Sequence, residues 1–266
     1  MVTEQHTSRR VVKIGREARG VDDDVAVEEP LEMRLAGETV ATTMRTPGHD
    51  ALLAQGFFYS EGFVERREQI GRVSHCGRAG TPEYGNVIDL LPAPGILVNF
   101  EGSGWTRRGT LINSACGVCG RNQIDDLLLR CQPFPSFAPI DDEDVPGYTR
   151  SLSENQPLFQ RTGGVHAAAA FDSHGAMVAC YEDVGRHNAT DKVIGRLLET
   201  DSLGSISVLV VSGRVSFEIV QKATTARIPA LVAISAPTSL AIDLALAMKM
   251  TLIGFARGEK FTRYTG

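Results

Sequence analysis

The 266-residue sequence has no apolar run long enough to cross a membrane as a helix. Its longest apolar stretches are four or five residues, such as Val208–Val211, whereas a spanning helix needs about 18 or more. Basic residues are not in excess, since the formal net charge is −5, and this excludes a general nucleic-acid coat. We therefore expect neither a membrane nor a nucleic acid as partner.

Cysteine is also scarce. Five cysteines, an odd number, occur in a chain that is large enough to bury a core without disulfides or metals. This favours reduced thiols and a cytoplasmic protein. Ser8–Lys13 resembles a twin-arginine export signal, but the apolar stretch that such a signal requires does not follow, and Asp22–Asp24 stand nearby instead.

The N-terminal half predicts a small, hairpin-rich α+β domain over residues 28–145. Residues 1–27 are polar with little periodicity, so we expect a mobile leader there. Residues 31–46 alternate around Ala36-Gly37, which indicates a β-hairpin. Residues 50–60 have helical spacing, and Asp50 could cap that helix. Four prolines and the acidic run Asp141–Asp144, read as a solvated linker or helix start, mark the end of this domain.

The C-terminal part, residues 146–266, predicts an α/β domain. A hairpin is expected at 166–171 and 176–182, followed by helices and strands that alternate. The expected helices are 187–199, 216–227 and 237–250, and the expected strands are 207–211, 230–234 and 251–256. Single helices between strands indicate a parallel sheet with right-handed crossovers.

A cysteine pair is the first candidate for chemistry. Cys116 and Cys119 stand in C-G-V-C-G, where flanking glycines favour reachable sulfur atoms, and Arg107, Arg108 and Arg121 would favour the thiolate. A structural zinc site would need two more ligands, which Cys76 and Cys131 could supply. A thioredoxin-like redox pair and a plain structural pair are further alternatives. The exposed, glycine-flanked thiol fits best a nucleophile that carries sulfur as a persulfide.

A second candidate is the polar segment Glu182–Lys192, E-D-V-G-R-H-N-A-T-D-K, between a predicted strand and a helix. Arg186 and His187 stand at the expected helix start, where an anionic group could bind. A solvated helix entry is the alternative.

The third candidate is a set of three strand ends, residues 212–216, 235–239 and 255–260. In an open parallel sheet these ends lie at one edge, where ligands bind, and two of them open helices. Arg214, Arg257 and Lys260 add positive charge. The combination suits a phosphorylated or nucleotide-like ligand, although ordinary small-residue loops remain an alternative and no Walker or G-x-G-x-x-G pattern names the nucleotide.

Several motifs together resemble one family. They are C-G-V-C-G at 116–120, T-G-G-V-H-A-A-A at 162–169, E-D-V-G-R-H-N-A at 182–189 and S-G-R-V-S-F-E at 212–218, with E-E-P-L-E at 28–32, P-G-H-D at 47–50 and S-A-P-T-S-L-A at 235–241. Their order and number resemble the FdhD family, the formate dehydrogenase accessory sulfurtransferases, over residues 25–265.

The resemblance implies a sulfurtransferase. Such a protein would take persulfide sulfur from a cysteine desulfurase and pass it to the molybdenum or tungsten centre of a bis(molybdopterin guanine dinucleotide) cofactor for formate dehydrogenase. By motif, Cys116 would be the persulfide cysteine and Cys119 its helper. The cofactor-binding residues expected from the family segment and from the strand-end argument are Phe255, Ala256, Arg257, Gly258, Glu259, Lys260, Ser212, Gly213 and Arg214. A homodimer is also expected. A non-catalytic cofactor-binding chaperone is the alternative.

The C-terminal half also resembles the cytidine-deaminase fold, which implies a three-layer α/β domain. Zinc deaminases carry H-x-E on the first helix and P-C-x-x-C after the next strand. Here His187 remains, but the general-acid/base Glu is missing and Ser212–Ser216 replaces the zinc thiolates. The sequence therefore predicts no bound metal and no hydrolytic deamination.

Overall fold

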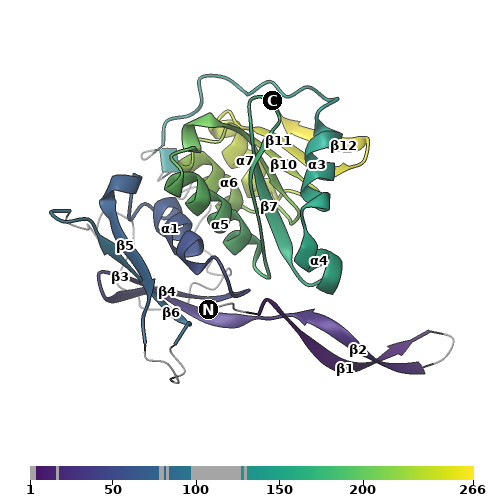
Figure 1. Cartoon of the computed structure of the whole chain (residues 1–266). Helices are drawn as coiled ribbons and strands as arrows, with labels where there is room; N and C mark the ends of the chain where they lie inside the picture. Colours follow the sequence, from purple (N-terminus) through teal and green to yellow (C-terminus); the bar gives the residue numbers. More distant parts are fainter. Residues whose placement is uncertain (1–3, 16–17, 78–80, 82–83, 97–126, 129–130) are drawn as a thin grey trace.

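The computed structural model describes residues 4–15, 18–77, 81, 84–96, 127–128 and 131–266 (Figure 1). The described chain is a mixed α/β protein with three β-sheets of six, four and two strands. None of its described helices is both long and apolar enough to span a membrane.

The six-stranded sheet is the core of the C-terminal part. Its strands are β7 (His166–Asp172), β8 (Met177–Asp183), β9 (Ile206–Val211), β10 (Ala230–Ala233), β11 (Thr251–Arg257) and β12 (Lys260–Thr265), in the order β12-β11-β10-β9-β7-β8. Strands β9, β10 and β11 are parallel, as predicted, and β7 is antiparallel to β8 and β9. The predicted hairpin of β7 and β8 is confirmed.

Helices cover both faces of this sheet. One face packs on α5 (Arg186–Glu199), α6 (Phe217–Thr225) and α7 (Ser239–Ala247), through residues such as Ile194 and Leu209. The other face packs on α3 (Val145–Glu154), with Val145 and Leu152 against the sheet, and α4 (Pro157–Thr162) follows α3. Strand β9 is apolar on both sides because it is buried on both faces. Helix α7 begins two residues after Pro237, with Thr238 as its N-cap.

The smaller four-stranded sheet forms the N-terminal part. It contains β3 (Glu29–Leu35), β4 (Glu38–Arg45), β5 (Ile70–His75) and β6 (Val87–Pro92), in the order β4-β3-β6-β5. The predicted hairpin at 31–46 is confirmed, because Ala36 and Gly37 both have positive φ (52° and 85°), as a two-residue type I′ turn requires. Helix α1 (Asp50–Ser60) covers this sheet with Leu53 and Phe58.

Helix α1 of the N-terminal part also packs on α5 of the C-terminal part (Figure 1). A glycine of each helix lies at this crossing. A Cβ on Gly56 would lie 1.9 Å from the carbonyl oxygen of Asp191, and a Cβ on Gly195 would lie 2.0 Å from that of Leu52. Only glycine permits so close a crossing, which sets the N-terminal sheet beside the start of α5.

The segment that we expected to be a mobile leader contains two paired strands. Strands β1 (His6–Ile14) and β2 (Ala18–Ala26) pair antiparallel and project from the body (Figure 1). These strands show no apolar alternation because most of their side chains meet solvent. Cross-strand charge pairs, such as Lys13 and Asp23 at 2.8 Å, connect them instead. The base of this two-stranded arm is tied to α4 by the Arg161–Asp24 pair.

Candidate functional site

The three predicted strand ends do meet at one edge of the six-stranded sheet. This edge, formed by the carboxyl ends of the parallel strands β9, β10 and β11, is called the C-terminal edge. The backbone N–H of Val215 donates to Ala236 O (3.1 Å), and that of Phe255 donates to Ser235 O (3.1 Å). Arg257 Nε donates to Ile234 O at 3.1 Å. Hydrogen bonds thus join the loops after β9, β10 and β11 into one surface.

The polar segment that precedes α5 reaches the same edge. A Cβ on Gly213 would lie 3.2 Å from Arg186 Cβ and 3.3 Å from His166 Nδ1, so both side chains pack against the residue that follows the end of β9. His166 is there because β7 runs antiparallel to β9 and therefore starts where β9 ends. The fold combines two constellations that were separate in the sequence.

Three hollows follow one another along this edge. A cavity of about 490 Å³ is lined by Gly163, Gly164, His166, Ser212 and Ile234 among others. Ile234 also lines the next cavity, of about 400 Å³, which reaches Arg150, Arg257 and Gly258. On its other side, His166 lines a third cavity, of about 460 Å³, between the N-terminal sheet and the starts of α5 and α6.

The predicted cofactor residues occupy this edge in different ways. Ser212 accepts the N–H of Ala167 through Oγ (2.9 Å), so its hydroxyl fixes the strand end. Phe255 is 44% exposed and has a φ of 52°, an uncommon backbone for a bulky residue. Ala256 is buried. Arg214, Arg257, Gly258, Glu259 and Lys260 are exposed.

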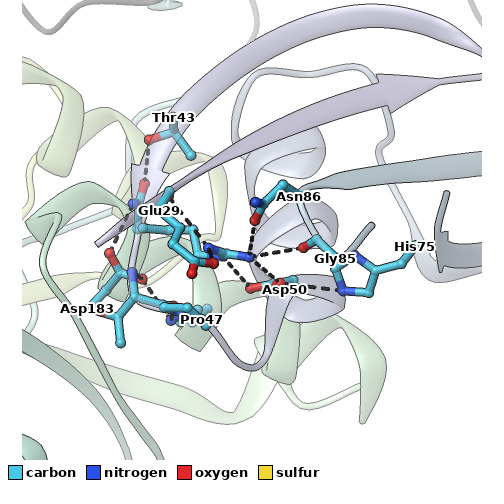
Figure 2. Close-up of polar contacts among 12 residues, drawn as sticks. Glu29, Thr43, Pro47, Asp50, His75, Gly85, Asn86 and Asp183 are labelled. Carbon is cyan, nitrogen blue, oxygen red and sulfur yellow. Dashed lines mark hydrogen bonds and ion pairs between the residues drawn. The ribbon is translucent and has the colours of Figure 1, made fainter. Parts of the chain in front are cut away.

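The segment Glu182–Lys192 separates into structural and available side chains. Asp183 and Lys192 are a fully buried ion pair, 2.7 Å apart, and Lys192 also donates to Thr46 O at 3.1 Å. Asn188 donates to Asp183 (3.0 Å) and to Met44 O (2.7 Å) and accepts from Thr43 (Figure 2). These three side chains clamp the end of β4 to the C-terminal part. We call Asp183, Asn188 and Lys192 the junction clamp.

Asp50 belongs to a second buried network and does not cap α1 as expected. His49 is the N-cap, and Asp50 instead pairs with buried Arg45 (3.0 Å) and with His75 (3.3 Å) (Figure 2). Burial raises the pKa of Asp50, but hydrogen bonds from His75 and Arg45 outweigh burial and lower it overall. The carboxylate is therefore charged and structural.

Glu182 is structural as well. Its carboxylate accepts the N–H groups of Leu158 (2.9 Å) and Phe159 (2.8 Å) at the start of α4. Arg186 and His187 line the third cavity and take no part in the junction clamp.

His187 is held neutral. Burial, together with the charges of Lys222 and Arg186, lowers its pKa to about 4. Its Nε2 lies 3.2 Å from Ser216 Oγ, and Ser216 hydrogen-bonds Glu218. Ser216 stands at the N-cap of α6 without a capping hydrogen bond from its side chain.

A buried ion pair closes the far wall of the third cavity. Lys222 lies 2.8 Å from Asp191 and 3.5 Å from Glu61. Burial raises the pKa of Asp191 to about 6, against the effect of Lys222. Burial lowers the pKa of Lys222, but the two carboxylates outweigh it and raise that pKa overall. The pair is charged at neutral pH.

Cys116, Cys119 and the neighbouring Arg107, Arg108 and Arg121 lie outside the described residues. Cys76, Cys131 and Cys180 are free thiols. Burial raises the pKa of Cys180 to about 11, so this thiol is a poor nucleophile. Within the described ranges, no three His, Cys, Asp or Glu side chains are grouped so that they could hold a metal ion.

Sequence reasoning missed two contributors to the edge. Arg150 comes from α3, far away along the chain, and no local signal marked it. Gly163 and Gly164 line a cavity, and they had been noted only as part of the T-G-G-V-H-A-A-A motif.

Comparison with known proteins supports the family resemblance that the sequence motifs indicated. The model of the FdhD/NarQ family matches residues 26–266. A protein of Anaeromyxobacter dehalogenans named sulfur carrier protein FdhD is 48% identical over 256 residues, which cover 94% of this chain and 89% of the relative. A protein of the same name from Mycobacterium tuberculosis is 45% identical over 255 residues, 91% of this chain and 90% of the relative.

A solved structure shares the fold. It is assigned as a formate dehydrogenase accessory protein from Desulfotalea psychrophila, with a TM-score of 0.76 and 21% sequence identity. The match covers 99% of this chain and 98% of the other. The whole described architecture therefore occurs in another protein.

Proposed function

Because the chain belongs to the FdhD/NarQ family, we propose that it is a sulfur carrier that loads persulfide sulfur on Cys116 and delivers it to a guanine-nucleotide pterin cofactor for formate dehydrogenase. The observation that carries the proposal is the glycine-flanked C-G-V-C-G pair in a chain whose relatives are named sulfur carriers. The donor is a cysteine desulfurase, and the cofactor is Mo-bis(molybdopterin guanine dinucleotide), or its tungsten counterpart, as cargo.

Loading is a thiol exchange that needs no redox partner. The Cys116 thiolate attacks the outer sulfur of the persulfide on the desulfurase, a new S–S bond forms, and the desulfurase cysteine leaves as its thiolate. A low thiol pKa at Cys116 favours this step, and the sequence places three arginines within 10 residues of it.

Release as sulfide requires two electrons, which gives Cys119 a role. The Cys119 thiolate would attack Sγ of Cys116, form a Cys116–Cys119 disulfide and expel the outer sulfur as hydrosulfide. An external dithiol would then reduce the disulfide. The products balance, because the sulfane sulfur gains the two electrons that the two cysteines lose.

The cargo is expected at the C-terminal edge of the sheet. Arg257, Gly258 and Arg150 line one hollow, and Ser212 and His166 line the next, so an elongated ligand with phosphate groups fits the chemistry of the walls. The absent Cβ of Gly213 leaves room for the side chains of Arg186 and His166 at this edge. The choice of guanine as the base of this ligand rests on the family resemblance.

A cofactor-binding chaperone without sulfur chemistry is the second candidate. It is favoured by the same hollows and would not use Cys116. A Cys116→Ala variant separates the two, because a pure chaperone would still support active formate dehydrogenase.

The test of the proposal is mass spectrometry. After incubation with a cysteine desulfurase and free cysteine, the intact wild-type chain should gain one sulfur atom that a reductant removes. Cys116→Ala should gain none. The matched Cys119→Ala variant should load sulfur and keep it until an external thiol is added, whereas the loaded wild type should also release hydrosulfide slowly without added thiol, as the Cys116–Cys119 disulfide forms. Undiminished loading of Cys116→Ala on another residue would contradict the assignment.

The homodimer and the cytoplasmic location stay predictions. Light scattering at micromolar concentration decides the first, and cell fractionation the second.

A further inference from the structure

Two arginines at the sheet edge have no carboxylate partner for an ion pair among the residues that the structure describes. Arg186 is the first residue of α5, and Arg214 lies in the loop between β9 and α6. Atoms of Arg186 lie 3.2 and 3.3 Å from the Cβ position of Gly213, so its side chain packs against the residue that precedes Arg214. Burial and then the charge of Arg214 lower the pKa of Arg186. The two like charges therefore repel each other.

The polar groups around this pair lack acceptors. Nε of Arg186 is enclosed and makes no hydrogen bond with any group in the described part of the chain. Among the residues that the structure describes, neither guanidinium forms an ion pair within 4.0 Å, and the backbone N–H groups of Gly213 and Arg214 find no acceptor. Glu218 attracts Arg186, but this carboxylate is bonded to Ser216 and to its own backbone N–H.

Other buried cations of the molecule have carboxylate partners. Arg45 pairs with Asp50, Lys192 with Asp183, and Lys222 with Asp191. Polar groups that are enclosed cost free energy unless they have partners, and charges cost more. A guanidinium beside a second one, with no ion-pair partner in the described part of the chain, therefore points to an anionic partner beyond these residues, and we take that partner to be a ligand.

We propose that Arg186 and Arg214 form a binding site for a phosphate group, where the cavities on the two sides of His166 meet. The fork of a guanidinium matches phosphate oxygens in a bidentate way, and two such groups suit a doubly charged phosphate. The free N–H groups of Gly213 and Arg214 and the start of the 14-residue helix α5 add donors of the right polarity. The proposal rests on the proposed function only for the identity of the molecule that carries the phosphate.

That molecule could be a nucleotide or free inorganic phosphate, and the ligands in the test distinguish them. Full-length protein is titrated calorimetrically with inorganic pyrophosphate, GDP and guanosine. The variants are Arg186→Gln and Arg214→Gln. The matched control is Arg196→Gln, which removes the same charge from an exposed position of α5 that pairs with Glu199.

Each site variant should lose about tenfold to a hundredfold in pyrophosphate affinity, and Arg196→Gln should lose none. Pyrophosphate should also raise the Tm of the wild type and the control more than that of either site variant. A parallel loss for GDP, with guanosine unaffected, assigns the phosphate to a nucleotide. Unchanged GDP affinity with weakened pyrophosphate binding assigns the site to free phosphate.

Unchanged pyrophosphate affinity in both site variants would overturn the proposal. An equal loss in Arg196→Gln would also overturn it, because general surface charge would then explain the binding. If Arg186→Gln does not fold, exposed Arg214 alone decides. Sulfur loading of Cys116 is measured on the same samples, and its failure beside intact phosphate binding would contradict the proposed function and leave this site standing.

Discussion

The cations at the junction between the two sheets and the cations at the C-terminal edge of the large sheet have opposite surroundings. At the junction, Lys192 is 0% exposed and lies 2.7 Å from Asp183, while Thr46 O accepts a further hydrogen bond from it. At the edge, Arg214, Arg257 and Lys260 are exposed and form no ion pair with a described carboxylate. The first set satisfies itself and holds the fold, whereas the second leaves its charge available to a ligand.

Breaking the junction clamp should have the largest effect. Asp183→Ala leaves the buried ammonium of Lys192 without its counter-ion, and we expect a loss of about 3–5 kcal/mol in the free energy of unfolding. Chemical denaturation measures it. Glu199→Ala, which breaks an exposed pair with Arg196, should cost under about 1 kcal/mol. Equal effects of the two changes would contradict the distinction between the regions.

Removing an edge cation should leave stability nearly unchanged and weaken nucleotide binding. Arg257→Ala and Lys260→Ala should each lower the affinity for GDP about tenfold to a hundredfold, since a charge-assisted phosphate contact is worth about 1.5–3 kcal/mol. Calorimetric titration measures this. Arg72→Ala, which removes an exposed charge from β5, is the control. Equal affinity in all the variants would remove residues 255–260 from the site.

A smaller, pH-dependent effect should come from His187, which lies between the two regions. Its pKa in the folded chain is about 4, below the roughly 6.5 of an unfolded histidine. The unfolded state therefore binds more protons, and stability falls as the pH drops from about 6.5 to 4, by at most about 1.4 kcal/mol per pH unit. His187→Gln should flatten that part of the stability profile. An unchanged slope would show that His187 is not held neutral.

The edge was predictable from sequence, and the junction was not. Apolar stretches such as Val208–Val211 indicated parallel strands, and the rule that their carboxyl ends share an edge brought residues 212–216 and 255–260 together. No such rule places Asp183 beside Lys192 and Thr46, because the first contact depends on how α5 packs on β8 and the second on how the N-terminal part packs on the C-terminal part. The sequence also does not predict the crossing of α1 and α5 at Gly56 and Gly195, since a glycine within a helix pattern does not indicate which element packs against it.

Other differences also have physical causes. The arm of β1 and β2 lacked a buried face, so the alternation that signals a strand was absent from its sequence. We expected Asp50 to cap α1 because aspartate is a common N-cap residue. Its carboxylate instead forms an ion pair with the buried guanidinium of Arg45. The roles assigned to Cys116 and Cys119 rest on the sequence alone.

A crystal structure of the full chain soaked with GDP tests the central claim most directly, since that claim is that unpaired cations mark the ligand site. The account predicts the nucleotide along the edge lined by His166, Ser212 and Arg257, with phosphate oxygens within hydrogen-bond distance of Arg257 or of Arg186 and Arg214. GDP in the cavity of about 610 Å³ lined by Tyr59 and Arg227, or no bound GDP at millimolar concentration, would contradict it.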